Sequence, residues 1–503
     1  MKISYKKSFL IFFMSFILLF LSGCVDMETE LIFQKDGTEG KTQSVDWSPC
    51  GQYIASSSTN NDIKIWNAVT GNTMKSWYDL SAIVSDISWS PEGNYLAGGG
   101  SDGAVRIWGD DYTVVGEEDA ESDIVEFEDY NLEKIVREVI DKTEGEIYLE
   151  EVLLIKELNV VGRGERAIKS FEGIQQLKNL ESLSFLGYKI ESLQPLAALE
   201  NLKELSFGAW EPTSIEDISP LVDLNNLQYL DIGGNRINDI TPLENLTNLR
   251  ELNLSINPIE DISALKQLGN LEKLNISRVR AADISEISNL ANLKHLNFER
   301  NSVKDISPLK NLVELEVLSF GGNYVEDISV LSNLTNLQHL HFGGSPLPVS
   351  GNLVTDLSPL KELTNLKYLN FYDNQVKNIS SLENLTNLES LNFANNKVKD
   401  ISVVANLSAL QKLDFGGLQG WSEGNLVEDV SALEYLPELN HLNFCENKVY
   451  DITPLVNNDN FGSGDEIDMR KNYLDLTPGS EDMINVQKLI DRGVKVSYEP
   501  QKD

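Results

Sequence analysis

Residues 246–265 read LTNLRELNLSINPIEDISAL, and closely similar stretches recur along most of the chain. Most successive copies start 22 residues apart, at Leu177, Leu199, Leu224, Leu246, Leu268, Leu290, Leu312, Leu334, Leu363, Leu385, Leu407 and Leu436. A fixed period of about 20 to 50 residues predicts an elongated array in which each repeat contacts only its neighbours.

The leucines of one copy explain why the copies must stack. Leu249, Leu252 and Leu254 are spaced to point inward from a short strand and the turn after it, while the residues between them point outward. Full burial of each leucine contributes about 1.5 to 3 kcal/mol. One copy cannot enclose these side chains, so the pattern predicts a continuous core shared by neighbouring repeats.

This repeat resembles the leucine-rich repeat, and its spacing is similar to that of the internalin-like bacterial class. The resemblance covers Leu177 to about Asn458, and an incomplete copy around 157–160 precedes it. It implies a leucine-rich-repeat solenoid with a parallel β-sheet on the concave face and short helical turns or loops on the convex face. Helical caps are expected at both ends, the first from an apolar stripe at Leu132, Ile135, Val136, Val139 and Ile140.

Two further repeated positions are interpreted as structural. An inward asparagine can bond backbone groups where the chain leaves the strand, at Asn235, Asn257, Asn301, Asn323, Asn374, Asn396 and Asn447. In the Asp-Ile-Ser triplet that follows, the Ser or Thr suits a helix N-cap, and a proline often suits the first helical position. A calcium ladder is rejected because one Asp per copy supplies too few oxygen ligands.

The candidate site lies on the concave face, at the variable positions between and just after the strand leucines. All four histidines of the chain fall there. Aromatic side chains above a floor of asparagines favour recognition of a protein or glycan partner. The predicted partner-binding residues are Tyr229, His295, His339, His341, Tyr368, Tyr372 and His441. They concentrate in Lys294–Asp373, and His339 and His341 lack the third ligand that a metal site needs.

Three copies are longer than the rest, at 25, 29 and 29 residues, and each insertion follows the strand. The first insertion carries Trp210 and the last carries Trp421, the only two tryptophans of the array. These side chains either anchor a partner from edge loops or fold back over the edge of the sheet.

A second period, of 42 residues, precedes the array. WSP at 47–49 recurs at 89–91, and IKIWN at 63–67 recurs as VRIWG at 105–109. Alternating apolar and polar residues predict short antiparallel strands. They resemble two WD-repeat blades, although Asn67 and Gly109 stand where an aspartate usually follows the tryptophan. A closed propeller needs about four to eight blades. Either several chains or another propeller fragment complete the ring, or the pair is a two-blade remnant packed on its neighbour; we favour the remnant.

The first residues predict export and anchoring. Lys2, Lys6 and Lys7 precede an apolar run over 9–21 that is too short to span a bilayer. Residues 21–24, LSGC, resemble the lipobox of bacterial lipoproteins. The resemblance implies a lipid on Cys24 and an extracytoplasmic protein anchored to the bacterial cell envelope.

Composition excludes several function classes. A net charge of -37 argues against nucleic acid, because phosphates would be repelled; adaptation to high salt remains another explanation for this acidity. The chain has no Gly-rich phosphate loop, nucleophile elbow, HExxH pair or Cys cluster, so we expect no enzyme activity, cofactor or metal.

Together these patterns predict a non-catalytic cell-envelope binding protein whose concave face takes a protein or glycan. The alternative is an assembly scaffold whose WD-like blades complete a propeller with another chain. The predicted organisation is a lipoprotein signal peptide (1–23), a tether (24–39), two WD-like blades (40–116), an acidic linker (117–129), an N-terminal cap with an incomplete repeat (130–176), twelve leucine-rich repeats (177–458) and a C-terminal cap (459–503).

Overall fold

The computed structural model describes residues 40–49, 51, 53–68, 71–78, 80–91, 93–109, 124–160, 168–185, 190, 192–208, 215–344, 352–417 and 424–502. The chain forms two compact units, divided between residues 122 and 123. Cys24, Trp210 and Trp421 lie outside the described residues.

The described residues of the N-terminal unit form two antiparallel sheets that correspond to the two copies of the 42-residue repeat. The first sheet has the strand order β1 (Thr42–Trp47), β2 (Tyr53–Ser58), β3 (Ile63–Asn67) and β4 (Thr73–Trp77). The second has the order β5 (Val84–Trp89), β6 (Leu96–Gly100) and β7 (Val105–Trp108). The predicted antiparallel WD-like segment is therefore confirmed.

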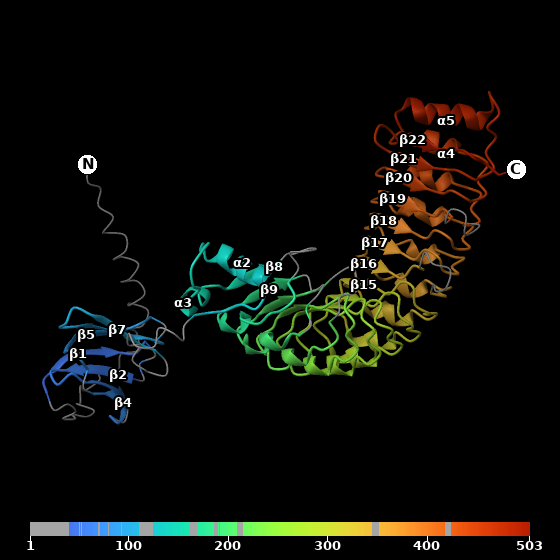
Figure 1. The fold of residues 1–503 in the computed structure, drawn as a ribbon. Coiled ribbons are helices and arrows are strands. Elements are labelled where there is room, and N and C mark those ends of the chain that lie inside the picture. Colours follow the sequence, from blue (N-terminus) through green and yellow to red (C-terminus); the bar gives the residue numbers. More distant parts are fainter. Residues whose placement is uncertain are drawn as a thin grey trace, which may run out of the picture. The chain divides into compact units, whose positions relative to one another are not determined.

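The second unit is a solenoid whose strands follow one another in chain order. Its described residues form a 15-stranded parallel sheet from β8 to β22. In Figure 1 these strands line the inner side of the solenoid's curve. The strands are Glu157–Val160, Ser182–Phe185, Glu204–Ser206, Tyr229–Asp231, Glu251–Asn253, Lys273–Asn275, His295–Asn297, Val317–Ser319, His339–His341, Tyr368–Asn370, Ser390–Asn392, Lys412–Asp414, His441–Asn443, Glu466–Asp468 and Lys495–Ser497.

Short helical turns alternate with the strands, so the predicted leucine-rich-repeat solenoid is confirmed. Most are 3-10 turns, at Ile174–Gln176, Gln194–Ala198, Ser219–Leu221, Thr241–Leu243, Ser263–Gln267, Ser285–Asn289, Ser307–Asn311, Ser329–Asn333, Ser358–Leu360, Ser380–Leu382, Ser402–Asn406 and Ser431–Tyr435. Among the described residues, the α-helices are α2 (Tyr130–Val139), α3 (Leu149–Val152), α4 (Thr453–Asn457) and α5 (Glu481–Asp491). Within the described ranges, every helix is too short or too polar to cross a bilayer.

Both predicted caps are present. In α2, Asp129 accepts hydrogen bonds from the backbone of Asn131 and Leu132, and the apolar stripe buries Leu132 and Val136 against the first strands. At the other end the cap extends the sheet as well as covering it, because β22 follows α5 and pairs with β21. This last strand was not expected from the repeat pattern.

A column of phenylalanines runs through the core of the later repeats. Consecutive ring centroids lie 5.4 to 5.9 Å apart, and the planes differ by only 11 to 18°. The column comprises Phe298, Phe320, Phe342, Phe371, Phe393, Phe415 and Phe444, all fully buried. Each ring therefore packs against the rings of both neighbouring repeats, except at the two ends of the column.

The inward asparagines bond the backbone, as predicted. Asn257 Nδ2 donates to the carbonyl oxygens of Ile232 (2.9 Å) and Leu254 (3.0 Å), and its Oδ1 accepts from the Ile237 N–H (3.0 Å). Two long repeats keep this bonding: Asn352 donates to the Phe342 carbonyl and Asn425 to the Phe415 carbonyl, each across 10 residues instead of the usual three. The asparagine thus ties adjacent repeats together through their backbones.

The prediction of a serine N-cap is wrong. The residue at the cap position is an isoleucine such as Ile262, which forms no side-chain cap hydrogen bond, and Ser263 already belongs to the 3-10 turn. The aspartate before the isoleucine closes the turn instead: Asp261 Oδ1 accepts from the Ser263 N–H at 2.8 Å. This hydrogen bond lowers the pKa of Asp261, which accounts for an acidic residue at the position without any metal.

Candidate functional site

The parallel register brings the predicted concave residues into two rows. We call them the first-position row and the third-position row, after the first and third residues of strands β11 to β20. In the first row, His339 stands directly between Val317 and Tyr368. In the third, His341 stands between Ser319 and Asn370. The predicted ladder of concave side chains is therefore confirmed as a spatial arrangement.

A hollow of about 330 Å³ lies over strands β11 to β15. Tyr229 and His295 line it, and between them Lys273 Nζ forms an ion pair with Glu251 Oε1 at 2.8 Å. Burial, together with the Asp231 carboxyl, raises the pKa of Tyr229. Burial, together with Lys273, lowers the pKa of His295, which favours its neutral form. The hollow thus combines two neutral rings with a charge pair that is already satisfied.

Two histidine–tyrosine pairs lie next to the hollow, over β16 and β17. The ring centroids of His339 and Tyr368 are 6.0 Å apart, and those of His341 and Tyr372 are also 6.0 Å apart. These four residues fall in the stretch that the sequence favoured. The hollow begins at β11, before that stretch, although two of its lining residues, Tyr229 and His295, were predicted from the sequence.

Glycines make room for the second pair. A Cβ atom on Gly321 would lie 2.8 Å from His341 Nε2, and one on Gly343 would come within 2.4 Å of Tyr372 Cδ1. Each ring therefore leans over the glycine of the preceding repeat. His341 and Tyr372 are partly buried by this packing, so they shape the surface more than they project from it.

His341 is neutral at physiological pH. Its Nε2 lies 3.3 Å from Glu299 Oε1, but burial lowers the pKa of His341 to about 4. Burial also raises the pKa of Glu299. Both shifts oppose an ion pair, so we describe the contact as a neutral imidazole beside a partly buried carboxyl group.

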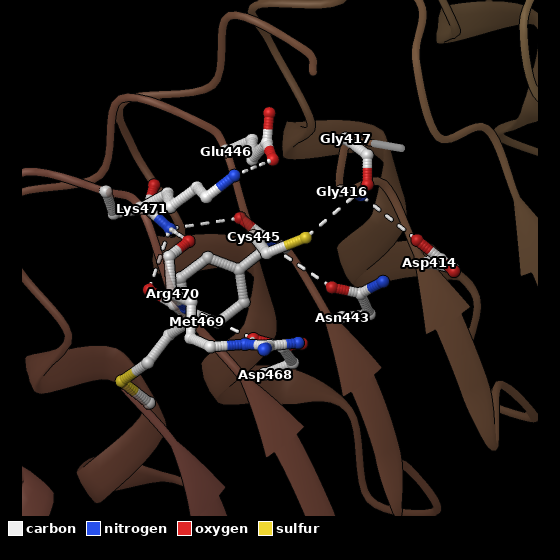
Figure 2. Close-up of polar contacts among 12 residues, drawn as sticks. Asp414, Gly416, Gly417, Asn443, Cys445, Glu446, Asp468, Met469, Arg470 and Lys471 are labelled. Carbon is white, nitrogen blue, oxygen red and sulfur yellow. Dashed lines mark hydrogen bonds and ion pairs between the residues drawn. The ribbon is translucent and has the colours of Figure 1, made fainter. Parts of the chain in front are cut away.

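The asparagine floor is largely occupied by the protein's own backbone. At most positions of the third-position row, a side-chain oxygen accepts the N–H two residues further on, as Figure 2 shows for Asn443 with Cys445 and for Asp414 with Gly416. Asn370 also donates to the Tyr368 hydroxyl at 3.0 Å. These residues fix the end of each strand, which the sequence interpretation of a ligand-binding floor did not foresee.

His441 stands apart from the other predicted residues. It lies on β20, three strands beyond Tyr368, and its Nδ1 is 3.7 Å from Glu466 Oε2. Cys445 follows the same strand, and burial raises the pKa of its thiol to about 11, so it behaves as an apolar side chain. Around it, Figure 2 shows the ion pairs between Lys471 and Glu446 and between Arg470 and Asp468.

A larger polar groove of about 570 Å³ follows the edge where strands begin, and the sequence analysis missed it. Its charges pair with one another: Glu272 contacts Arg250 at 3.3 Å and Lys294 at 2.8 Å. Its asparagines donate to backbone carbonyls of the preceding repeat, as Asn270 does to Thr247 at 2.9 Å. Since these groups already have partners, we regard the groove as a bracing ladder. Within the described ranges, no group of three or more His, Cys, Asp or Glu side chains could hold a metal ion.

The comparisons with known proteins agree with this geometry. Residues 291–333, 313–362 and 364–406 match the family model of leucine-rich repeats in two copies, and residues 31–67 and 73–109 match the WD domain, G-beta repeat. The crystal structure of the internalin InlF from Listeria monocytogenes is 32% identical, covers 71% of this chain and 99% of its own, and has a TM-score of 0.62. The chain belongs to the internalin-like leucine-rich-repeat proteins.

Other internalin-like and receptor solenoids share the fold at lower identity. InlJ of Listeria monocytogenes is 20% identical over 69% of this chain and 81% of its own, with a TM-score of 0.50. The plant peptide hormone receptor RGFR1, in complex with RGF2, is 18% identical over 70% of this chain and 61% of its own, with a TM-score of 0.52. No curated protein matches the sequence.

Proposed function

We propose that this internalin-like protein is a non-catalytic binding protein whose concave face takes a protein or glycan partner. The hollow over β11 to β15 carries the proposal, because its two rings, Tyr229 and His295, lie where the sheet offers a partner a continuous surface. RGFR1, which has the same fold, was crystallised in complex with RGF2, so a solenoid of this kind can hold a ligand.

The charge on this face supports recognition by shape and rings more than by ionic attraction. Among the first-position and third-position residues of β11 to β20, the acids are Asp231, Glu251 and Asp414 and the bases are Lys273 and Lys412. Three acids and two bases leave these rows nearly neutral in a chain of net charge -37. Nucleic acid remains excluded from the proposed partners by that overall charge.

Replacing Tyr229, His295 and His339 together by alanine should abolish partner capture. Each side chain is a ring at the hollow or beside it. If only two of the three contribute about 2 kcal/mol each to the binding free energy, their loss would weaken binding several hundredfold. The measurement is a pull-down from the native cell envelope, with bound proteins and glycans analysed separately. His341 and Tyr372 are left in place because they are packed into the surface.

The matched control replaces three exposed tyrosines on other faces, Tyr435, Tyr450 and Tyr473, by alanine. Capture should persist in this control, and both proteins should unfold at nearly the same temperature as the unaltered chain. Equal capture by the two variants would exclude the hollow as the binding site.

We further propose that Cys24 carries a lipid that holds the protein on the outer side of a bacterial cell membrane. A Cys24→Ser variant should move completely from the detergent phase to the aqueous phase on phase partitioning, because the sulfur that accepts the lipid is gone. Cys445→Ala is the control and should stay in the detergent phase, since that thiol is buried in the solenoid. Retention of the Cys24→Ser variant in the detergent phase would contradict lipid anchoring.

A further inference from the structure

Equivalent positions of the two WD repeats differ sharply in exposure. The two copies are offset by 42 residues, so each side chain of the first sheet has a counterpart in the second. Where the two sheets pack together, apolar side chains of both are buried in one cluster. For four of these side chains, Ile63, Ile65, Ile87 and Trp89, the counterpart in the other repeat is exposed on an outer face.

The first outer face belongs to β1. Val45 is 62% exposed, whereas its counterpart Ile87 is 4% exposed; Trp47 is 57% exposed, whereas its counterpart Trp89 is 8% exposed. Ile87 and Trp89 are buried in the apolar cluster between the two sheets. The surface formed by Val45 and Trp47 on the first sheet therefore corresponds to the surface of the second sheet that packs against the sheet before it.

The second outer face belongs to β7. Val105 is 73% exposed and Ile107 is 50% exposed, whereas their counterparts Ile63 and Ile65 are 0% and 1% exposed. Ile63 and Ile65 are buried in the same cluster, on the side of the first sheet that meets the second. The surface formed by Val105 and Ile107 on the second sheet therefore corresponds to the surface of the first sheet that packs against the sheet after it.

Polar contacts also cross the existing junction. Ser44 Oγ donates to Asp86 Oδ1 at 2.7 Å, and the Trp89 N–H donates to Asp46 Oδ2 at 2.8 Å. At a new junction one repeat further on, the counterparts of Ser44 and Asp86 are Asp86 and Ser44 of the next molecule. Because the one hydroxyl hydrogen of Ser44 is already donated to Asp86 of its own chain, the new junction rests on its apolar side chains.

We propose that these two outer faces are the two halves of one interface, filled by a second copy of this chain. The β7 face of one copy packs on the β1 face of the next and continues the junction already present within each copy. Such a head-to-tail contact uses two different surfaces and closes into a ring when the rotation permits. A closed propeller of about four to eight blades would need two, three or four copies. This assembly, and not a two-blade remnant, accounts for the exposure of Trp47 and Ile107.

The mass of the chain from residue 25 to 503 in solution tests the proposal. By sedimentation velocity over a range of concentrations, the unaltered chain should form a discrete assembly of two, three or four copies. Trp47→Glu and Ile107→Glu should each shift this species to monomer, because each places a charge in the apolar junction. Tyr435→Glu places the same charge at an exposed ring of the solenoid, which belongs to neither face, and should leave the assembly unchanged.

Mixing the two variants is the decisive experiment. The Trp47→Glu protein keeps an intact β7 face, and the Ile107→Glu protein keeps an intact β1 face, so an equimolar mixture should form a 1:1 dimer and nothing larger. If either variant loses its folded circular dichroism spectrum, Val45→Lys and Val105→Lys replace the pair. A monomeric unaltered chain at the highest concentration, variants that still assemble, or a mixture that stays monomeric would each overturn the proposal.

Discussion

Replacing Phe342 with alanine should lower the free energy of unfolding of the solenoid by about 3 to 5 kcal/mol. The ring is fully buried and stacks on Phe320 at 5.4 Å and on Phe371 at 5.7 Å. Its removal would leave a cavity between two repeats and end the column in the middle. Because a solenoid is stabilised only by contacts between neighbours, no distant part of the molecule can compensate.

Urea denaturation monitored by circular dichroism measures this loss. Phe342→Leu is the graded comparison and should cost less, because leucine fills part of the same volume and occupies this position as Leu254 in an earlier repeat. Tyr435→Ala, which truncates an exposed ring, should change the free energy of unfolding by less than about 0.5 kcal/mol. If Phe342→Ala were as mild as Tyr435→Ala, the column would have no stabilising role.

Acidification from about pH 6.5 to pH 4 should destabilise the unaltered protein through His341. Burial lowers the pKa of His341 to about 4 in the folded protein, whereas the ordinary pKa of histidine is 6.5. In this window the unfolded chain binds a proton that the folded protein does not, so stability falls as the pH falls. The full shift corresponds to about 3 kcal/mol, reached near the lower end of the window.

His341→Asn removes this effect while restoring the residue that other repeats carry at the same position, as Asn297 and Asn370 do. The difference in free energy of unfolding between the two proteins should change by up to about 3 kcal/mol from pH 7 to pH 4. The raised pKa of carboxyls such as Asp231 and Asp414 acts with the opposite sign, since those groups stabilise the folded state as the pH falls. Because both proteins contain these carboxyls, their contribution largely cancels in the difference in free energy of unfolding. A pH-independent difference would show that His341 titrates normally.

Much of the solenoid follows from the sequence because each repeated position has one physical task. Leucine spacing predicted the sheet and its inward side chains, and the inward asparagines were correctly assigned to backbone bonding. The register then brought His339 beside Tyr368 as expected. The phenylalanine column was not predicted, because it replaces aliphatic residues in only part of the array and depends on how rings stack between repeats.

The candidate site was less predictable, since it depends on side-chain lengths and on which polar groups are already bonded. Asn443 belongs to the asparagine floor that the sequence analysis assigned to a partner, yet its oxygen accepts a backbone N–H in the structure. The serine of Asp-Ile-Ser was misassigned for a similar reason: serine and aspartate can both accept the same type of hydrogen bond, and only the backbone conformation decides between them. The hollow beside Tyr229 needs the curvature of the sheet as well.

Asn352 and Asn425 have a consequence for how this protein can diversify. Each donates a hydrogen bond to the carbonyl of the phenylalanine in its own repeat, although seven additional residues lie between the two. The phenylalanine and the asparagine on either side of the insertion are therefore held as in an ordinary repeat, and they form two fixed points. Segments placed between the phenylalanine and the asparagine can therefore change in length and sequence without a change in the stacking of the solenoid. Foreign peptides could be grafted between these two fixed points, and new specificities could evolve there.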